Sequence, residues 1–389
     1  MHWRRGQAIS QAVNQDNDQA QENTQTFKAM INEPAKHLFQ FMTLDETDAF
    51  IIGPKGAGKT RLIINALTNV PQDYAVIVFD IAGNYEGYTD YHAPYPLNPL
   101  NHLNVIEVLD VLGEVLTMRF PRLNYVMTPA MEHMFITAHN ELTTKAQESG
   151  VETTIGDLIK HLDESIKSGL IAREDEVNSA RGLIRRLQYF NHWIFQKTHP
   201  LINRLLKGEL KGRSIGIDLR WLTPVQRWFY VLTLLATLNT ADVRNVILVI
   251  DEAHLYFRLG ESTLTLSLRI GRNFNRYFAL ITQSPFDIPR EFISMNKLFV
   301  AFPTMFFEPE NIIFREVGLN AYFGRDEFYK SRGLSTSAIT PPHWEPLTAI
   351  MHLHITNKQL FEMTAEKKPY IELWIKANPT TPPKPNATT

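Results

Sequence analysis

The sequence predicts an α/β protein with a mostly parallel sheet flanked by helices, and three observations support this fold. Short, continuous apolar runs recur along the 389-residue chain, as expected of strands that are buried on both faces of a sheet. Segments with helical spacing separate these runs and can serve as crossover connections. Two of the runs end in residues that suit phosphate and metal binding, and α/β proteins place such residues at the carboxyl edge of the sheet.

The first of these runs, ending at Ile52, leads into a glycine-rich loop with the pattern G-x-x-x-x-G-K-[ST]. Its glycines let backbone N–H groups converge on phosphate oxygens, and the following helix directs its positive dipole end at the same anions. Lys59 is expected to reach the β and γ phosphates, while the Thr60 hydroxyl holds Mg²⁺. The predicted nucleotide-binding residues are Gly53, Pro54, Lys55, Gly56, Ala57, Gly58, Lys59, Thr60 and Arg61. A chance match in a glycine-rich turn is the alternative, and the correct order of strand, loop and helix disfavours it.

The second run, residues 243–250, is the most apolar strand of the chain and ends in Asp251 and Glu252. This ending is typical of a Walker B strand, in which Asp251 contributes to the Mg²⁺ shell and Glu252 activates the attacking water. In isolation, an acidic pair at a strand end more often belongs to a solvated loop or a helix cap. Because a phosphate loop lies upstream in the same chain, the Walker B interpretation is favoured here over a solvated loop or a helix cap. His254 is weaker evidence, because a histidine at this position is more often structural.

Residues 261–274 are expected to form a helix that bears Arg269 and Arg272, and the strand 277–282 after it ends at Gln283. Arg276 follows just after this helix, and three basic residues on and around a helix usually form a solvated face. In ring ATPases, however, an arginine of one subunit completes the site of its neighbour. Gln283 is either an ordinary loop residue or a sensor of the γ-phosphate.

Composition restricts the functional classes without choosing among them. The formal net charge of −2 provides no global basic field, so any contact with nucleic acid must come from local patches. Cysteine is absent, which excludes disulfides and thiolate chemistry and fits a reducing compartment. No apolar run approaches the roughly 20 residues that span a bilayer, and no signal core is present at the start. We therefore expect a cytoplasmic protein, or one of the virion or host cytoplasm if it is viral.

Changes in pattern predict five regions of the chain. A nucleotide-binding core is interrupted by a helical block that is too long for an ordinary crossover. Helices are expected within it at 105–118, 129–142, 155–168 and 177–195, the third capped by Thr154 and Asp157. The regions are a polar tail and linker helix (1–45), the first part of the core (46–100), the helical insertion (101–212), the second part of the core (213–375) and a Pro/Thr-rich tail (376–389).

The ordered set of motifs resembles the HerA–FtsK superfamily of P-loop ATPases, which are DNA pumps of the additional-strand, RecA-like class. The resemblance is closer to the HerA branch and to conjugative ATPases than to FtsK, and it covers roughly residues 45–355. The motifs that carry it are the phosphate loop at 53–60, Phe79-Asp80 with Gly83-Asn84-Tyr85, Leu97-Asn98-Pro99-Leu100, Ile217-Asp218-Leu219, residues 249–254, Arg269 with Gly271-Arg272, and Thr282-Gln283-Ser284-Pro285 with Asp287-Ile288-Pro289.

The resemblance implies a homo-oligomeric ring, a hexamer, that hydrolyses ATP with Mg²⁺ between subunits and moves double-stranded DNA without reading its sequence. It implies that Lys59, Thr60, Asp251, Glu252 and Gln283 act as described above and that Arg269 or Arg272 is the trans-acting arginine. Asn84 stands where the family usually has an acidic residue, and no space precedes the phosphate loop for the small barrel of HerA. The compact form instead resembles viral genome-packaging ATPases. Export of protein or filaments, and a nucleotide-gated scaffold, remain alternatives.

Overall fold

The computed structural model describes residues 27–120, 126–149, 152–257, 263–283, 296–302, 348–355 and 370–377, together with residues 25 and 292. The chain divides into two compact units. The first contains residues 1–71 and 279–382, and the second contains residues 72–278 and 383–389. Within the described residues, no helix is long and apolar enough to cross a membrane.

The first unit contains a mixed sheet and the helix that follows the phosphate loop. Strand β1 runs parallel to both the last four residues of β6 and β7, and β7, β8 and β9 then pair antiparallel in that order. Its elements are α2 (Leu38–Leu44), β1 (Ala49–Ile52), α3 (Lys59–Leu67), the end of β6 (Arg276–Thr282), β7 (Leu298–Ala301), β8 (Thr348–His354) and β9 (Tyr370–Lys376). All four residues of β1 are buried, as expected for a central parallel strand.

The second unit contains four parallel strands in the order β3-β4-β2-β5. They are β2 (Ala75–Asp80), β3 (Tyr91–Ala93), β4 (Ser214–Asp218) and β5 (Val246–Ile250). Strands β2, β4 and β5 are buried along their whole length. The register pairs Asp80 with Asp218 and Phe79 with Ile250, so the polar ends of these three strands lie level with one another.

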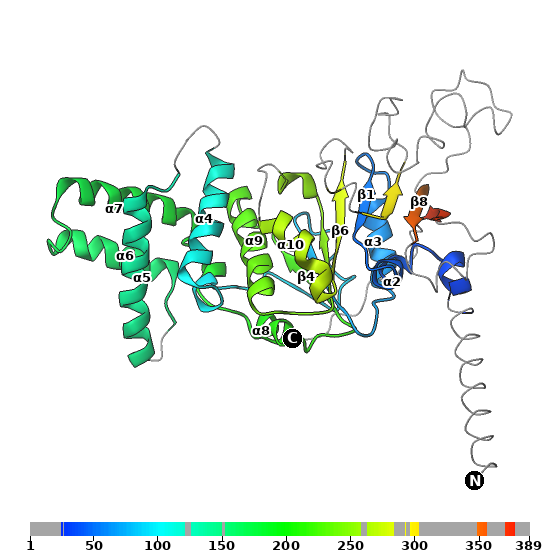
Figure 1. Ribbon diagram of the computed structural model, residues 1–389, viewed down its shortest axis with the longest axis horizontal. Coiled ribbons are helices and arrows are strands. Elements are labelled where there is room, and N and C mark those ends of the chain that lie inside the picture. Colours follow the sequence, from blue (N-terminus) through cyan, green and yellow to red (C-terminus); the bar gives the residue numbers. More distant parts are fainter. Residues whose placement is uncertain are drawn as a thin grey trace, which may run out of the picture. The chain divides into compact units, whose positions relative to one another are not determined.

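Helices make up the rest of the second unit. Helix α9 is largely buried and packs against α4, whereas α5, α6 and α7 pack on one another and form a helical group next to α4 (Figure 1). The helices are η1 (Pro99–Asn101), α4 (Val105–Arg119), α5 (Pro129–Ser149), α6 (Ile155–Lys167), α7 (Glu174–Leu187), η2 (Gln188–Phe190), η3 (Trp193–Phe195), α8 (Pro200–Leu206), α9 (Pro224–Thr240), η4 (Ala253–Leu255), α10 (Thr263–Gly271) and η5 (Arg272–Phe274).

Several local expectations are confirmed. The Thr154 hydroxyl accepts a hydrogen bond from the Asp157 N–H, and the Asp157 carboxylate accepts one from the Thr154 N–H, so α6 begins in the expected capping box. The apolar runs 297–302 and 349–355 predict two further strands, and β7 and β8 form within two residues of these bounds. Strands β3 and β9 were not predicted. The sequence also predicts a helical region near 309–317, and this region and the two terminal tails, apart from their inner ends, lie outside the described residues.

The predicted single helix at 177–195 is wrong. Helix α7 begins at Glu174 and ends at Leu187, and the short turns η2 and η3 follow it. The rings of Phe190 and Phe195 both contact Phe229 of α9, with centroids 4.3 and 5.0 Å away. Five residues of a continuous helix rotate by about 140° beyond a full turn, which would turn these two rings away from a common partner. The break in the helix lets both rings be buried.

Phe229 should therefore contribute strongly to the stability of the second unit. It is fully buried, and Phe229→Ala removes the ring on which η2 and η3 pack. We expect the free energy of unfolding to fall by about 3–5 kcal/mol, measured by urea denaturation. Leu170→Ala removes a side chain that is 81% exposed and should change it by less than about 0.5 kcal/mol. A loss below about 1 kcal/mol for Phe229→Ala would contradict this packing.

Candidate nucleotide-binding site

The phosphate loop lies between β1 and α3 and has the backbone geometry that anion binding requires. Gly56 and Gly58 have φ angles of +80° and +115°, and Gly58 is the N-terminal cap of α3. Residues with side chains rarely adopt these angles, and the open space around Gly56 leaves the loop accessible. The first N–H groups of α3 have no acceptor within the helix. The loop thus fits a polyphosphate.

Lys59 is buried at the start of α3, and its side chain folds back over the loop. Its Nζ donates hydrogen bonds to the carbonyl oxygens of Gly53 and Pro54, at 2.5 and 2.9 Å. These contacts hold an ammonium group next to the loop amides, where phosphate oxygens would take the place of the carbonyls as acceptors. Thr60 follows in the first turn of α3 and is partly exposed, as a metal ligand requires.

Gln283 lies beside the phosphate loop in the same unit. Ile52 pairs with Thr282, and the Gly53 N–H donates to the Thr282 carbonyl oxygen at 3.2 Å, so Gln283 directly follows a residue that contacts the loop. On the other side, a Cβ atom at Gly53 would come within 2.6 Å of the Phe302 Cβ. This glycine is therefore required for packing between β6 and β7 as well as for the loop.

The acidic half of the site is at the end of β5 in the second unit. The Asp251 Oδ1 accepts a hydrogen bond from the Glu252 N–H at 2.9 Å. Glu252 has a left-handed backbone, with φ of 53°, which costs free energy in a residue with a side chain and is common at functional sites. Its Oε2 lies 3.4 Å from the Nδ1 of His254, and both side chains are about a quarter exposed. Glu252 is therefore held at the surface of the sheet edge.

Three aspartates lie level with one another at this edge. Asp80 pairs with Asp218, and Asp251 lies at the same level because the residues before Asp80 and Asp251 are paired. Neighbouring strands are about 4.8 Å apart, so three carboxylates on β4, β2 and β5 repel one another unless other groups compensate them. Backbone N–H groups and His92 do so for Asp80, and Arg220 does so for Asp218.

Asp80 is fully buried and organises the loop after β2. Its Oδ1 accepts hydrogen bonds from the N–H groups of Ala82, Gly83 and Asn84, and its Oδ2 accepts one from the Tyr85 N–H. The Nε2 of His92 lies 3.0 Å from the same Oδ2. Burial acts to raise the pKa of Asp80, but the hydrogen bonds from His92, Tyr85 and Gly83 outweigh it and lower that pKa.

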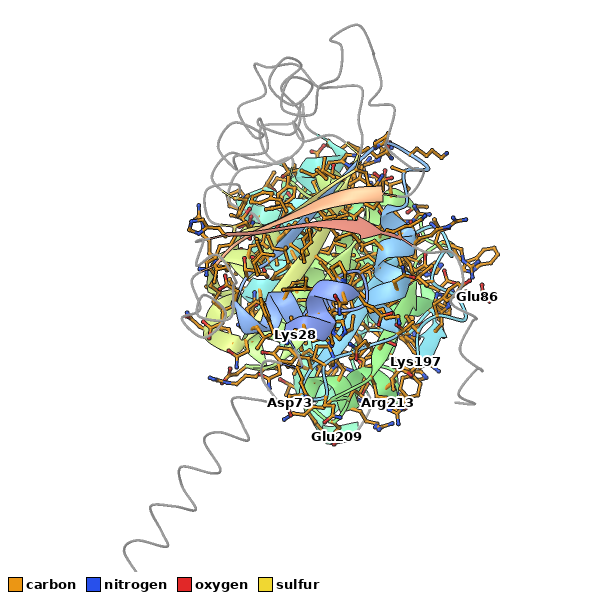
Figure 2. All side chains as sticks on the ribbon, turned by 90° about the vertical axis from the view of Figure 1, so that its right-hand side faces the viewer. Lys28, Asp73, Glu86, Lys197, Glu209 and Arg213 are labelled. Atoms are coloured by element: carbon orange, nitrogen blue, oxygen red, sulfur yellow. The ribbon has the colours of Figure 1, made fainter. Side chains whose placement is uncertain are left out.

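Asp218 is compensated by Arg220, whose Nε and Nη2 both bond to its carboxylate at 2.8–3.2 Å. Against the effect of burial, these bonds lower the pKa of Asp218. The Nη2 of Arg220 also reaches the Glu86 Oε2 at 3.0 Å, which ties the Asp80 loop to β4. Figure 2 shows Glu86 projecting from the surface.

The two predicted arginines lie at the end of α10 and the start of η5. Arg269 is in the last turn of α10, Arg272 begins η5, and both are exposed. The second unit thus contains Asp251, Glu252 and both arginines, whereas the first contains the phosphate loop and Gln283. Whether the two halves meet around one magnesium nucleotide stays a prediction, as does the role of each residue.

The chemistry of both halves fits a nucleotide and Mg²⁺. No cluster of three or more His, Asp or Glu side chains suitable for a metal is found in the described part of the chain. Mg²⁺ needs no such cage, because it commonly uses one or two protein groups together with substrate phosphates and water. Thr60 and Asp251 are groups of that kind.

Sequence reasoning included Asp80 in a motif at this edge without giving it a role, and it missed His92 and Arg220. A signal was present for Asp80, because three apolar strands each end in aspartate, in Phe79-Asp80, Ile217-Asp218 and Ile250-Asp251. No local pattern indicated His92 or Arg220. Their bonds to Asp80 and Glu86 span 12 and 134 residues along the chain.

No family model and no curated protein matches the sequence. Among solved structures, the chain is similar to VirB4 of Thermoanaerobacter pseudethanolicus, with 13% identity, a TM-score of 0.52 and coverage of 85% of this chain and 90% of that one. It is also similar to the plasmid coupling protein TrwB in complex with ADP and Mg²⁺, with 14% identity, a TM-score of 0.53 and coverage of 88% of each chain. These likenesses confirm the P-loop ATPase fold that the motifs indicated.

Asp80→Asn should destabilise the second unit in a pH-dependent way. The amide leaves four backbone N–H groups competing for one oxygen, and we expect a loss of about 3 kcal/mol at pH 7. Since the pKa of Asp80 is lowered by folding, its contribution is complete above the ordinary value of 3.8 and is lost as the pH falls below it.

The measurement is urea denaturation of wild type and variant between pH 7 and pH 3. The gap between the two stabilities should be constant at the upper end and shrink at the acid end. Asp73→Asn, which changes an exposed aspartate just before β2, serves as the control. Equal stabilities of wild type and Asp80→Asn at pH 7 would refute the role given to this carboxylate.

Proposed function

We propose that the chain is a DNA-translocating ring ATPase of the HerA–FtsK type, a hexamer that hydrolyses ATP with Mg²⁺ and moves double-stranded DNA. The observation that carries the proposal is the pair of half-sites on a P-loop fold. One is a glycine cradle with a buried lysine beside Gln283, and the other is an Asp-Glu pair at the end of a buried strand. Genome packaging and conjugative transfer are the processes that such a motor would serve.

In the proposed mechanism, the two half-sites close around one nucleotide. Loop amides between Gly53 and Thr60 and the Lys59 ammonium would bind the β and γ phosphates. Thr60 and Asp251 would hold Mg²⁺, whose charge would compensate that of the phosphates. The partly exposed carboxylate of Glu252 would orient water for attack and accept its proton, with its direction set by the strained backbone. Gln283, next to the loop, senses the terminal phosphate.

Asp251 is the natural choice for the metal among the three level aspartates. Asp80 and Asp218 already accept several hydrogen bonds each from groups of the chain. A metal at either of them would have to break those bonds. Asp251 lies directly before Glu252, the residue proposed to orient water, and accepts a hydrogen bond from its N–H.

Glu252→Gln should separate binding from hydrolysis. The amide keeps the shape of the side chain and cannot accept a proton, so we expect phosphate release to fall by at least about 100-fold, with the affinity for ATP unchanged. Phosphate release and the anisotropy of a fluorescent ATP analogue measure the two properties. Glu86→Gln alters another exposed carboxylate of the same sheet edge and should hydrolyse normally. A Glu252→Gln variant with wild-type turnover would remove Glu252 from the mechanism.

Mixed assemblies should identify the arginine that acts across the interface. Arg269→Ala and Arg272→Ala are each mixed with Lys59→Ala, and phosphate release is measured with and without duplex DNA. The variant whose arginine acts in trans should regain activity, because its intact phosphate loop then meets the intact arginine of a Lys59→Ala neighbour. Lys59→Ala mixed with Glu252→Gln should not recover. If duplex DNA does not change the rate of phosphate release in any mixture, the result would favour an export ATPase or a nucleotide-gated scaffold.

A further inference from the structure

Outside the nucleotide site, residues 177–208 form a strongly basic segment. This stretch of 32 residues contains no aspartate or glutamate, in a chain whose overall charge is −2. It begins within α7, passes through η2 and η3, and ends just after α8. Its cationic residues are Arg181, Arg185, Arg186, Lys197, Arg204 and Lys207.

Several of these cations are not neutralised by the protein. Arg181, Arg185 and Lys197 are exposed, and among the described residues none of them forms an ion pair. Figure 2 shows Lys197 on the surface. Arg186 differs, because its guanidinium donates to the carbonyl oxygens of Val126 and Gly182 and so braces the end of α7. Its pKa is lowered first by burial and then by the positive charge of Arg185.

Exposed aromatic rings lie between these cations along the chain. Trp193 is 51% exposed and Tyr189 is 39% exposed. Tyr189 contacts the edge of Phe120, with ring centroids 6.1 Å apart, and the guanidinium of Arg119 lies 5.2 Å from the centre of the Phe120 ring. Arg119, in the last turn of α4, thereby adds another exposed cation beside the segment. We define the basic aromatic surface as Arg119, Arg181, Arg185, Tyr189, Trp193 and Lys197.

The backbone beneath this surface is fixed. Phe190 and Phe195 are buried against Phe229, and the side-chain amide of Gln226 donates to the Tyr189 carbonyl oxygen at 3.1 Å. Tyr189 and Trp193 therefore belong to the turns η2 and η3, which pack on α9. The acidic residues of α7 are in its first turn, and a rise of about 1.5 Å per residue places Asp175 about 9 Å from Arg181 and about 15 Å from Arg185 along the helix axis. The positive charge of α7 therefore lies in its C-terminal half.

We propose that the basic aromatic surface binds single-stranded nucleic acid. Unpaired guanidinium and ammonium groups are suited to phosphates, and binding releases the counterions of the backbone. Half-exposed rings are suited to stacking on bases, which a single strand can present and a duplex cannot. A protein partner would be expected to bury these rings under an apolar face, and the absence of carboxylates over 32 residues favours a polyanion instead. This inference does not depend on the proposed ATPase activity.

Binding of a fluorescent 30-nucleotide single strand, without ATP, tests the proposal. The double variant Arg181→Glu/Arg185→Glu should weaken binding at least tenfold, measured by anisotropy, and lower the slope of log affinity against log salt by about 1.4. The matched control is Lys160→Glu/Lys167→Glu, which makes the same change in charge on α6 of the same helical group and should bind normally. Circular dichroism and the unfolding midpoint verify that both variants are folded.

Trp193→Leu tests the stacking contribution, because it keeps an apolar side chain and removes the ring. We expect single-strand affinity to fall by about fivefold or more and the quenching of tryptophan fluorescence by the oligonucleotide to decrease. Lys59→Ala should bind the strand like wild type, which separates this surface from the nucleotide site. The proposal is overturned if Arg181→Glu/Arg185→Glu binds within twofold of wild type. It is also overturned if polyglutamate binds the surface as tightly as the single strand, or if the duplex binds more tightly.

Discussion

The structure of the second unit depends on how it compensates three level aspartates at one edge of a parallel sheet. Parallel strands in register bring Asp80, Asp218 and Asp251 to the same edge, and carboxylates at that spacing repel one another. Other groups of the chain compensate two of these charges. Four backbone N–H groups and His92 bond to Asp80, and Arg220 bonds to Asp218. The third, Asp251, is the one that we propose for the metal, because a cation there would compensate its charge without breaking the hydrogen bonds that hold Asp80 and Asp218.

The phosphate loop gathers charge in the same way, but the charge is positive. The N-terminus of α3, the amides of a glycine loop and the Lys59 ammonium gather positive charge at one end of β1. Carbonyl oxygens of the loop itself compensate part of it, and an anionic ligand can compensate the rest. A loop that collects positive charge and a strand end that collects negative charge are complementary to the two components of a magnesium nucleotide. The geometry of each half therefore supports the proposal independently.

Local features of the fold could be predicted from the sequence, and features set by distant contacts could not. The phosphate loop, the strand before Asp251 and the cap at Thr154 depend on residues within a few positions of one another, so their patterns were sufficient. The end of α7 was missed because Phe229, some 40 residues away, draws both Phe190 and Phe195 into one cluster. Arg220 bonds to Asp218 only two residues away, but its contact with Glu86, 134 residues distant, could not be predicted from a local pattern. The net charge of −2 likewise gave no indication of the basic segment 177–208, because acidic residues elsewhere in the chain offset its positive charge.

An ordinary structural explanation accounts for part of that basic segment and leaves the rest unexplained. Cations in the last turn of a helix interact favourably with its dipole, and acidic residues do so in the first turn, which explains Arg185, Arg186 and the opposite end of α7. The dipole acts only within the terminal turns, so it explains neither Arg181 nor Lys197. It also does not account for an indole that stays half exposed while the neighbouring Ile194 and Phe195 are fully buried. A binding surface explains the charges and the ring together.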